Sequence, residues 1–183
     1  MTNAKFRLLE DDIIEVWERK LYRIESLEDF ANVQKGDKGG YLEKEENLAT
    51  TGDAWVFGNA RVSGNARVSG NAEVSGNAWV SGDAEVFGNA WVSGDAWVFG
   101  NARVSGNAEV FGNADLIAIY PIGSESGILT AFKNKEGKIS VTRGCFAGTL
   151  EEFAVAVEKT HGDNNHAKSY RIAIELIKSR LEE

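Results

Sequence analysis

Residues 54–65 read AWVFGNARVSGN, and the six-residue phrase within them recurs eleven times without an insertion from Ala54 to Leu116. Each phrase has the form Ala-x-Val-x-Gly-(Asn/Asp), so its apolar residues lie two positions apart, which is the period of a β-strand. The Gly-Asn and Gly-Asp pairs tolerate the left-handed backbone conformation that a sharp corner needs. Because self-similarity at a short fixed period is the signature of a solenoid, each phrase is predicted to be one short strand followed by one corner.

Such short strands cannot bury their inner faces alone, so they must stack on copies of themselves, with three phrases to a turn. The phrase resembles the hexapeptide repeat of left-handed β-helix proteins, in which an aliphatic residue and, four positions on, a small residue point inward. The resemblance implies a mainly β protein built on a left-handed parallel β-helix, a fold that serves acyltransferases, carbonic anhydrases and inert scaffolds alike. Leu42 and Leu48 precede Ala54 by twelve and six residues, which predicts a degraded start of the coil near Tyr41.

The chain is predicted to divide into a mixed N-terminal cap over 1–47, the β-helix over 48–117 and a C-terminal α/β module over 118–183. A cap is expected because the first coil would otherwise expose strand edges and an apolar interior. Within the cap, Phe6–Leu8 and Lys20–Ile24 have strand patterns, and Ser26–Phe30 is predicted to form one helical turn.

The C-terminal module is predicted to be a compact ββαα unit. Its expected elements are strands over 128–133 and 139–142, a first helix between the Thr149 capping box and Gly162, and a second helix from about Asn165 to Leu181.

The composition is that of an ordinary globular protein, with 183 residues, 43% hydrophobic residues and a net charge of -8. The acidic balance argues against nonspecific binding to nucleic acid. No apolar run approaches the length of a membrane span, and residues 1–5 lack the apolar stretch of a signal peptide. The single cysteine, Cys145, excludes an intrachain disulfide and suits a reducing cytoplasm.

Several segments outside the main repeat carry a second resemblance: Leu21–Ile24, Gly36–Glu43, Glu46–Leu48, Pro121–Ser124, Gly144–Thr149 and Thr160–Asp163. They look like those of a widespread group of phage and prophage proteins with hexapeptide repeats. The resemblance implies a phage origin, a location in the host cytoplasm, and candidate roles in counter-defence or host takeover, but no particular activity. Members of the group carry an Arg shortly after the Gly-Ser and a Cys-Gly-Cys-Phe stretch, where this chain has Glu125 and Arg143-Gly-Cys145-Phe146.

The outward positions of the coil sort into three faces, because residues 18 apart lie one strand spacing apart, about 4.8 Å. The first face stacks Trp55, Glu73, Trp91 and Glu109; the second stacks Arg61, Trp79, Trp97 and Asp115; the third stacks Arg67, Glu85 and Arg103. The aromatic residues on the first two faces exceed the scattered exposed apolar residues of a monomer, so a covering is expected.

Two coverings remain open. In one, an aromatic face meets the symmetry mate of a homotrimer and the C-terminal helices cover the other aromatic face. In the other, Trp79 and Trp97 beside Arg61 stack a nucleobase or another aromatic ligand.

A second candidate site lies at the start of the first C-terminal helix. The free amides of Gly144, Gly148 and Thr149 could hold a phosphate with Arg143 nearby. A Cys-His nucleophilic pair is a weaker hypothesis, because a helix of about 12 residues, or 18 Å, separates Cys145 from His161. Cys145 is therefore expected to be a buried structural residue. No cofactor or metal is expected, because no cluster has metal-ligand spacing.

Three classes of function are compatible with these patterns. Acyltransferases and carbonic anhydrases of this fold depend on histidines, and residues 54–116 contain no His and no Cys. We therefore expect a non-enzymatic, phage-encoded, oligomeric binding protein that sequesters a nucleotide signal or blocks a host defence protein. The alternatives are a purely structural scaffold and, third, an acyltransferase-like or other enzyme.

Overall fold

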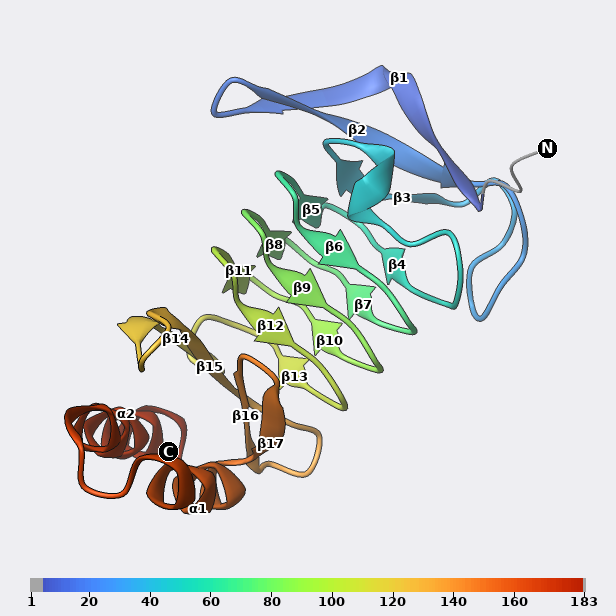
Figure 1. The fold of residues 1–183 in the computed structure, drawn as a ribbon. Coiled ribbons are helices and arrows are strands. Elements are labelled where there is room, and N and C mark those ends of the chain that lie inside the picture. The colour runs from blue at the N-terminus through green and yellow to red at the C-terminus, as the bar shows by residue number, and fades with distance from the viewer. Residues whose placement is uncertain (1–4, 183) are drawn as a thin grey trace.

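A computed structural model describes residues 5–182, and its most regular part is a coil of two-residue parallel strands (Figure 1). The coil strands are β4 (Trp55–Val56), β5 (Arg61–Val62), β6 (Arg67–Val68), β7 (Glu73–Val74), β8 (Trp79–Val80), β9 (Glu85–Val86), β10 (Trp91–Val92), β11 (Trp97–Val98), β12 (Arg103–Val104) and β13 (Glu109–Val110). Each strand pairs in parallel with the strand 18 residues away, as Trp79 does with Trp97. The mainly β solenoid with three faces is thus confirmed, and its left-handedness stays a prediction.

The repeated residues explain this geometry directly. Every Ala and Val at an inward position from Ala54 to Val110 is at most 1% exposed, so the coil encloses a narrow apolar core. At the corners the backbones of successive turns touch. Gly82 has a φ of 72°, and a Cβ there would lie 3.0 Å from both the nitrogen and the oxygen of Gly100. Only glycine fits such a corner without strain.

The Asn and Asp residues that follow the corner glycines form ladders of side-chain hydrogen bonds along the coil. Asn71 donates to Asn89 at 3.2 Å and Asn89 to Asn107 at 3.3 Å, and Asn65 and Asn77 donate to Asp83 and Asp95 in the same way. These polar side chains therefore hold the turns of the coil together.

The N-terminal cap extends the sheet of the second face. Its elements are β1 (Phe6–Val16), β2 (Arg19–Ser26), β3 (Lys38–Leu42) and the short 3-10 helix η1 (Glu45–Asn47), and the sheet order is β1-β2-β3-β5-β8-β11. Strand β3 pairs in parallel with β5, Tyr41 lying opposite Arg61, which confirms the predicted start of the coil.

The predicted helical turn at Ser26–Phe30 is wrong. Leu27 donates its N–H to Lys5 at 2.9 Å, and Phe30 forms an isolated bridge with Val33. Pairing with other parts of the cap satisfies these backbone groups, so they do not form local helical bonds.

The first turn of the coil is closed by buried side chains of the cap. Trp55 pairs with Glu73 on the first face, as predicted, but it is 1% exposed and lies edge-on to Phe6 and Phe30. The cap therefore covers it, rather than the symmetry mate or the C-terminal helices that were expected. The Lys5 Nζ donates to the carbonyls of Gly52 and Ala54 at 2.8 and 2.7 Å. Burial lowers the pKa of the Lys5 ammonium, and the nearby acidic side chains only partly offset this.

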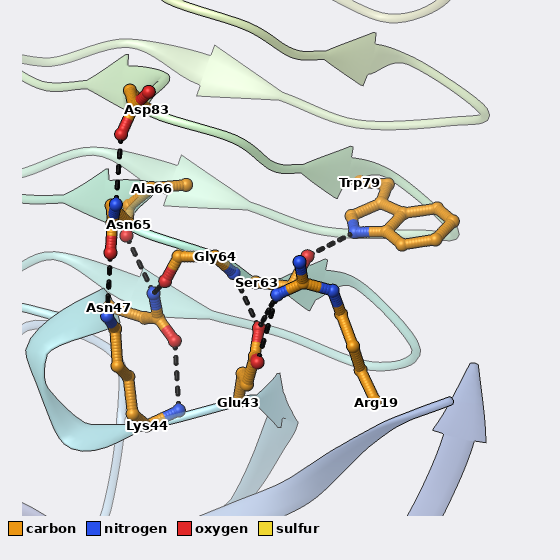
Figure 2. Close-up of polar contacts among 10 residues, drawn as sticks. All are labelled: Arg19, Glu43, Lys44, Asn47, Ser63, Gly64, Asn65, Ala66, Trp79 and Asp83. Atoms are coloured by element: carbon orange, nitrogen blue, oxygen red, sulfur yellow. Dashed lines mark hydrogen bonds and ion pairs between the residues drawn. The ribbon is translucent and has the colours of Figure 1, made fainter. Parts of the chain in front are cut away.

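A polar junction fixes the cap to the second turn (Figure 2). The Glu43 carboxylate accepts a 2.6 Å hydrogen bond from the Gly64 N–H and a 2.8 Å bond from Arg19 Nη1. The buried Asn47 side chain donates to the carbonyls of Gly64 and Ala66. Burial raises the pKa of the Glu43 carboxyl, but the Gly64 hydrogen bond and Arg19 together outweigh burial and hold that pKa below its usual value.

After the coil, an antiparallel sheet and two helices follow. They are β14 (Leu116–Ile122), β15 (Gly127–Lys133), β16 (Ile139–Arg143), β17 (Phe146–Thr149), α1 (Leu150–His161) and α2 (Asn165–Leu181), and the sheet order is β14-β15-β16-β17. The predicted hairpin and both helices are confirmed. The predicted ββαα unit omitted β14 and β17, so the module is in fact ββββαα.

The final repeat leaves the coil instead of completing a turn. Leu116 pairs with Phe132 of β15, and the predicted stacking of Asp115 on Trp97 is wrong, because the Trp97 N–H instead donates to the Asn113 side chain. Phe132 is 1% exposed and belongs to the core of the coil, so the sheet closes this end.

The helices pack on the other side of this sheet, where Phe153 and Ile177 meet Leu129 and Val141. Figure 1 shows both helices beyond the end of the coil. The prediction that the helices cover an aromatic face of the coil is therefore wrong.

Candidate functional site

Two tryptophans of the second face form a stack on neighbouring rungs. The ring centroids of Trp79 and Trp97 are 5.7 Å apart, with an interplanar angle of 14°. Each indole N–H donates to a serine of the preceding rung, Trp79 to Ser63 and Trp97 to Ser81. Because the N–H groups are already bonded, the indoles offer their ring faces to a partner.

A third tryptophan lies over this stack. The tip of the β1–β2 hairpin consists of Trp17 and Glu18, both with positive φ. This turn places the ring centroid of Trp17 4.6 Å from that of Trp79 and 5.9 Å from that of Trp97. A bulky residue with positive φ is uncommon, which marks the position for a functional hypothesis. Trp17 itself is 69% exposed. Sequence reasoning missed this residue, and its only signal was an indole in the turn between two predicted strands.

The exposed aromatic surface continues toward the C-terminal sheet. The ring centroids of Phe99 and Trp97 are 5.3 Å apart. Phe99 also lines a hollow of about 490 Å³, together with Ala118, Tyr120 and Ile128. We call Trp17, Trp79, Trp97, Phe99 and Tyr120 the aromatic band.

Charged groups surround the aromatic band. The Arg61 guanidinium is 5.9 Å from the Trp79 ring, at the outer limit of a cation–π contact. Asp83 and Asp95 are exposed on the two corners beside the band, and Glu15 and Glu18 are exposed on the hairpin. The hairpin also carries the exposed cations Arg19 and Lys20, so these four carboxylates outnumber the three cations Arg19, Lys20 and Arg61 by one.

The structure brings Arg61, Trp79 and Trp97 together, as the sequence hypothesis required, but it leaves no slot between the indoles. A base held between two rings needs them roughly 7 Å apart, twice the 3.4 Å stacking distance in nucleic acid. The Trp79 and Trp97 centroids are 5.7 Å apart, and Trp17 lies against both rings. A ligand can reach only the outer surface of the band.

The first face carries a smaller exposed aromatic pair. Trp91 and Phe111 are 45% and 46% exposed, and their rings meet edge-on at 5.1 Å. The neighbouring rungs of this face present Glu73 and Glu109. We call Trp91 and Phe111 the first-face pair.

The predicted phosphate site at the start of α1 is not assembled. Thr149 caps the helix, and its own N–H donates to the Glu152 carboxylate at 2.8 Å. Gly148 lies in β17, and a Cβ there would be 2.6 Å from the same carboxylate. An anion at this place would meet the negative charge of Glu152. Arg143 and Gly144 are at the opposite end of the β16–β17 hairpin from Thr149.

Arg143 and Gly144 instead line a hollow of about 500 Å³ between the hairpin tip and the helices. We call it the C-terminal hollow. Cys145 also lines this hollow and is exposed, so the prediction of a buried cysteine is wrong. His161 lines the same hollow and packs on Tyr170, with ring centroids 5.6 Å apart. Cys145 and His161 were expected to be kept apart by the helix, but both line the same hollow.

Across residues 5–182, no group of three or more His, Cys, Asp and Glu side chains has the geometry to hold a metal ion. In the same range, no helix is long and apolar enough to cross a membrane.

Comparison with known proteins agrees with the coil. The YdcK beta solenoid repeat model matches overlapping windows at residues 54–70, 60–76 and 66–82. A comparison with curated proteins finds no match. The chain is therefore similar to a β-solenoid repeat family over the early turns of the coil, and this similarity does not extend to the two terminal modules.

Proposed function

We propose that this chain is a non-enzymatic binding protein that holds a protein partner on the aromatic band. The observation that carries the proposal is the run of contacting rings from Trp17 through Trp97 to Phe99, with Tyr120 of the C-terminal sheet on the same hollow as Phe99. Trp17, Trp97, Phe99 and Tyr120 are each at least 40% exposed. Contiguous exposed apolar surface of this kind marks interaction sites, and tryptophan and tyrosine are the residues most often found at binding hot spots.

The charges around the aromatic band select the chemistry of the partner. Ring faces attract cations, and the exposed Glu15, Glu18, Asp83 and Asp95 beside the rings do the same. The net charge of -8 adds a long-range attraction for positively charged partners. The partner surface should therefore present arginine or lysine side chains among apolar ones.

The coil presents the band at little entropic cost. Parallel backbone bonds such as Trp79 N–H to Ala96 at 2.9 Å fix every rung, and the indole bonds to Ser63 and Ser81 fix the rings. A preorganised surface loses less conformational freedom on binding than a loop does.

The resemblance of the terminal segments to phage proteins supports the biological setting. In that setting the partner is a host defence protein in the cytoplasm, and the band blocks it by occupying its surface. The nucleotide alternative has less support at this site, because the indoles leave no slot for a base.

A parallel homotrimer is part of the proposal. In a three-fold assembly of triangular coils, each chain uses two faces for its neighbours and turns the third outward. Glu73 and Glu109 of the first face can pair with Arg67 on the third face of a neighbour, where Arg103 is already paired with Glu85 at 2.9 Å. This arrangement leaves the aromatic band of every copy free for the partner.

The test is to capture partners from host extract with the full chain and to measure the affinity of each purified partner by calorimetry. We expect Trp97→Ala to lower the affinity of the true partner at least tenfold and added salt to weaken it. The control Ile172→Ala, at an exposed apolar residue of α2 outside the band and the coil faces, should leave it unchanged. A partner that the Trp97→Ala variant binds as tightly as the wild-type protein does would overturn the proposal.

A further inference from the structure

We propose that the C-terminal hollow binds a small organic anion, with a carboxylate or phosphate on Arg143 and a planar ring against the aromatic wall. This site is separate from the aromatic band and goes beyond the proposed function.

The charge of Arg143 is the first argument. Its Nε donates to the Tyr170 hydroxyl and its Nη2 to the Ile122 carbonyl, both at 3.0 Å, and both acceptors are neutral. Within residues 5–182 no carboxylate forms an ion pair with Arg143. Arg23, which is also partly buried, differs in this respect, because its Nε lies 3.1 Å from an Asp12 carboxylate oxygen. A guanidinium that is half-buried and lacks a counter-ion favours an anion, which it can bind through its remaining N–H groups.

The space around Arg143 is the second argument. A Cβ at Gly123 would overlap the Tyr170 hydroxyl, and a Cβ at Gly127 would lie 2.7 Å from Arg143 Nη1. Any side chain at either position would displace the guanidinium. The two glycines thus leave room for Arg143 at the hollow, and its bonds to Tyr170 and Ile122 fix its orientation. A purely structural link between β14 and α2 accounts for its Nε and Nη2 bonds but not for its place on the wall of the hollow.

The lining of the hollow is the third argument. Phe146 packs on Phe153 at 5.2 Å, and His161 packs on Tyr170 at 5.6 Å, so ring faces and edges form its wall. A volume of about 500 Å³ is within the usual range for small-molecule sites. Glu125 also lines the hollow and repels every anion there, so a ligand with a single anionic group fits better than one with several.

Cys145 gives a direct assay, because the single thiol of the chain lines the same hollow and is exposed. The rate of its alkylation by N-ethylmaleimide is measured on the full chain with adenosine monophosphate, adenosine, benzoate, benzamide or inorganic phosphate. We expect at least one of the two ring-bearing anions to slow alkylation at least fivefold and to bind by calorimetry. Its neutral analogue should do neither.

Two variants separate binding from structure. Arg143→Gln should lower the affinity at least tenfold, while Arg180→Gln, at an exposed arginine near the end of α2, should leave it unchanged. If Arg143→Gln melts early, Cys145→Trp fills the hollow from its rim and should abolish binding of the anion, read by calorimetry.

Three results would overturn the inference. They are equal effects of the anions and their neutral analogues, no effect of either anion at millimolar concentration, and undiminished binding by both hollow variants. The aromatic band is intact in these variants, so failure here leaves the proposed function standing.

Discussion

At the scale of single residues, the repeat determines which side chains point inward. Val80 is fully buried, whereas its neighbour Ser81 is partly exposed on the second face. Alternation along a two-residue strand predicted this difference, because every second side chain points to the same side.

Val80→Asp should therefore cost about 3 to 5 kcal/mol of unfolding free energy, since it places an unpaired charge in an apolar core. Ser81→Asp should change it by no more than about 0.5 kcal/mol, because the new carboxylate stays at the surface and can still accept the Trp97 indole N–H that Ser81 accepts. Urea unfolding of both variants measures the difference. Equal midpoints would mean that the inward and outward assignment is wrong.

Glu43 gives the fold a dependence on acid. Its pKa is lowered in the folded chain, so its contribution to stability is complete above the ordinary value of 4.5 and is lost as the pH falls below that value toward the folded pKa. We expect Glu43→Gln to lower the unfolding free energy by about 1 kcal/mol at pH 7 and to flatten its decline below pH 4.5.

Thermal unfolding from pH 7 to pH 3 measures this, with the exposed Glu46→Gln as the control. An acid decline in Glu43→Gln as steep as that of the wild type would assign the dependence to other carboxyls.

At the scale of elements, the sequence predicted the coil, the C-terminal hairpin and both helices, because their periodicity and caps are local signals. It could not predict the contact between Trp17 and Trp79, since that contact depends on the length and twist of a hairpin about sixty residues away in the chain. Strand β14 was missed because Leu116 continues the apolar spacing of the repeat, and only its pairing with Phe132 takes it out of the coil.

The same limit applies to the candidate sites. Arg61, Trp79 and Trp97 are brought together because a fixed period of 18 residues places them on one face. Arg143 and Thr149 are close in sequence but lie at opposite ends of a hairpin, because β17 continues up to Thr149. A helix start that looks free in the sequence is in fact occupied by Glu152.

The β1–β2 hairpin is expected to depend on Trp17 for its position over the coil. Trp17→Asn keeps a residue that tolerates positive φ and removes the indole. Aromatic pairs contribute about 0.5 to 1.5 kcal/mol, so amides near the hairpin tip should exchange with deuterium several times faster while amides of the coil keep their rates. Unchanged exchange at the tip would show that the indole contact does not hold the hairpin.

At the scale of the whole molecule, the account requires a trimer that leaves the second face free. Light scattering at micromolar concentration should give about three times the 19.9 kDa mass of the chain. Replacing Trp91 with serine should dissociate the assembly, and replacing Trp97 with serine should not. A stable monomer in the wild type, or dissociation by the Trp97 change alone, would contradict the assignment of faces.

The central claim is that the aromatic band meets a different protein while the other faces meet copies of this chain. Site-specific photo-crosslinking tests it directly, because Phe99, Phe111 and Phe87 place one phenylalanine on each face and each can be replaced by benzoyl-phenylalanine. In cells that produce the chain, we expect position 99 to crosslink to a different protein and positions 111 and 87 to crosslink to the chain itself. Crosslinks from position 99 to this chain alone, or to no protein, would contradict the account.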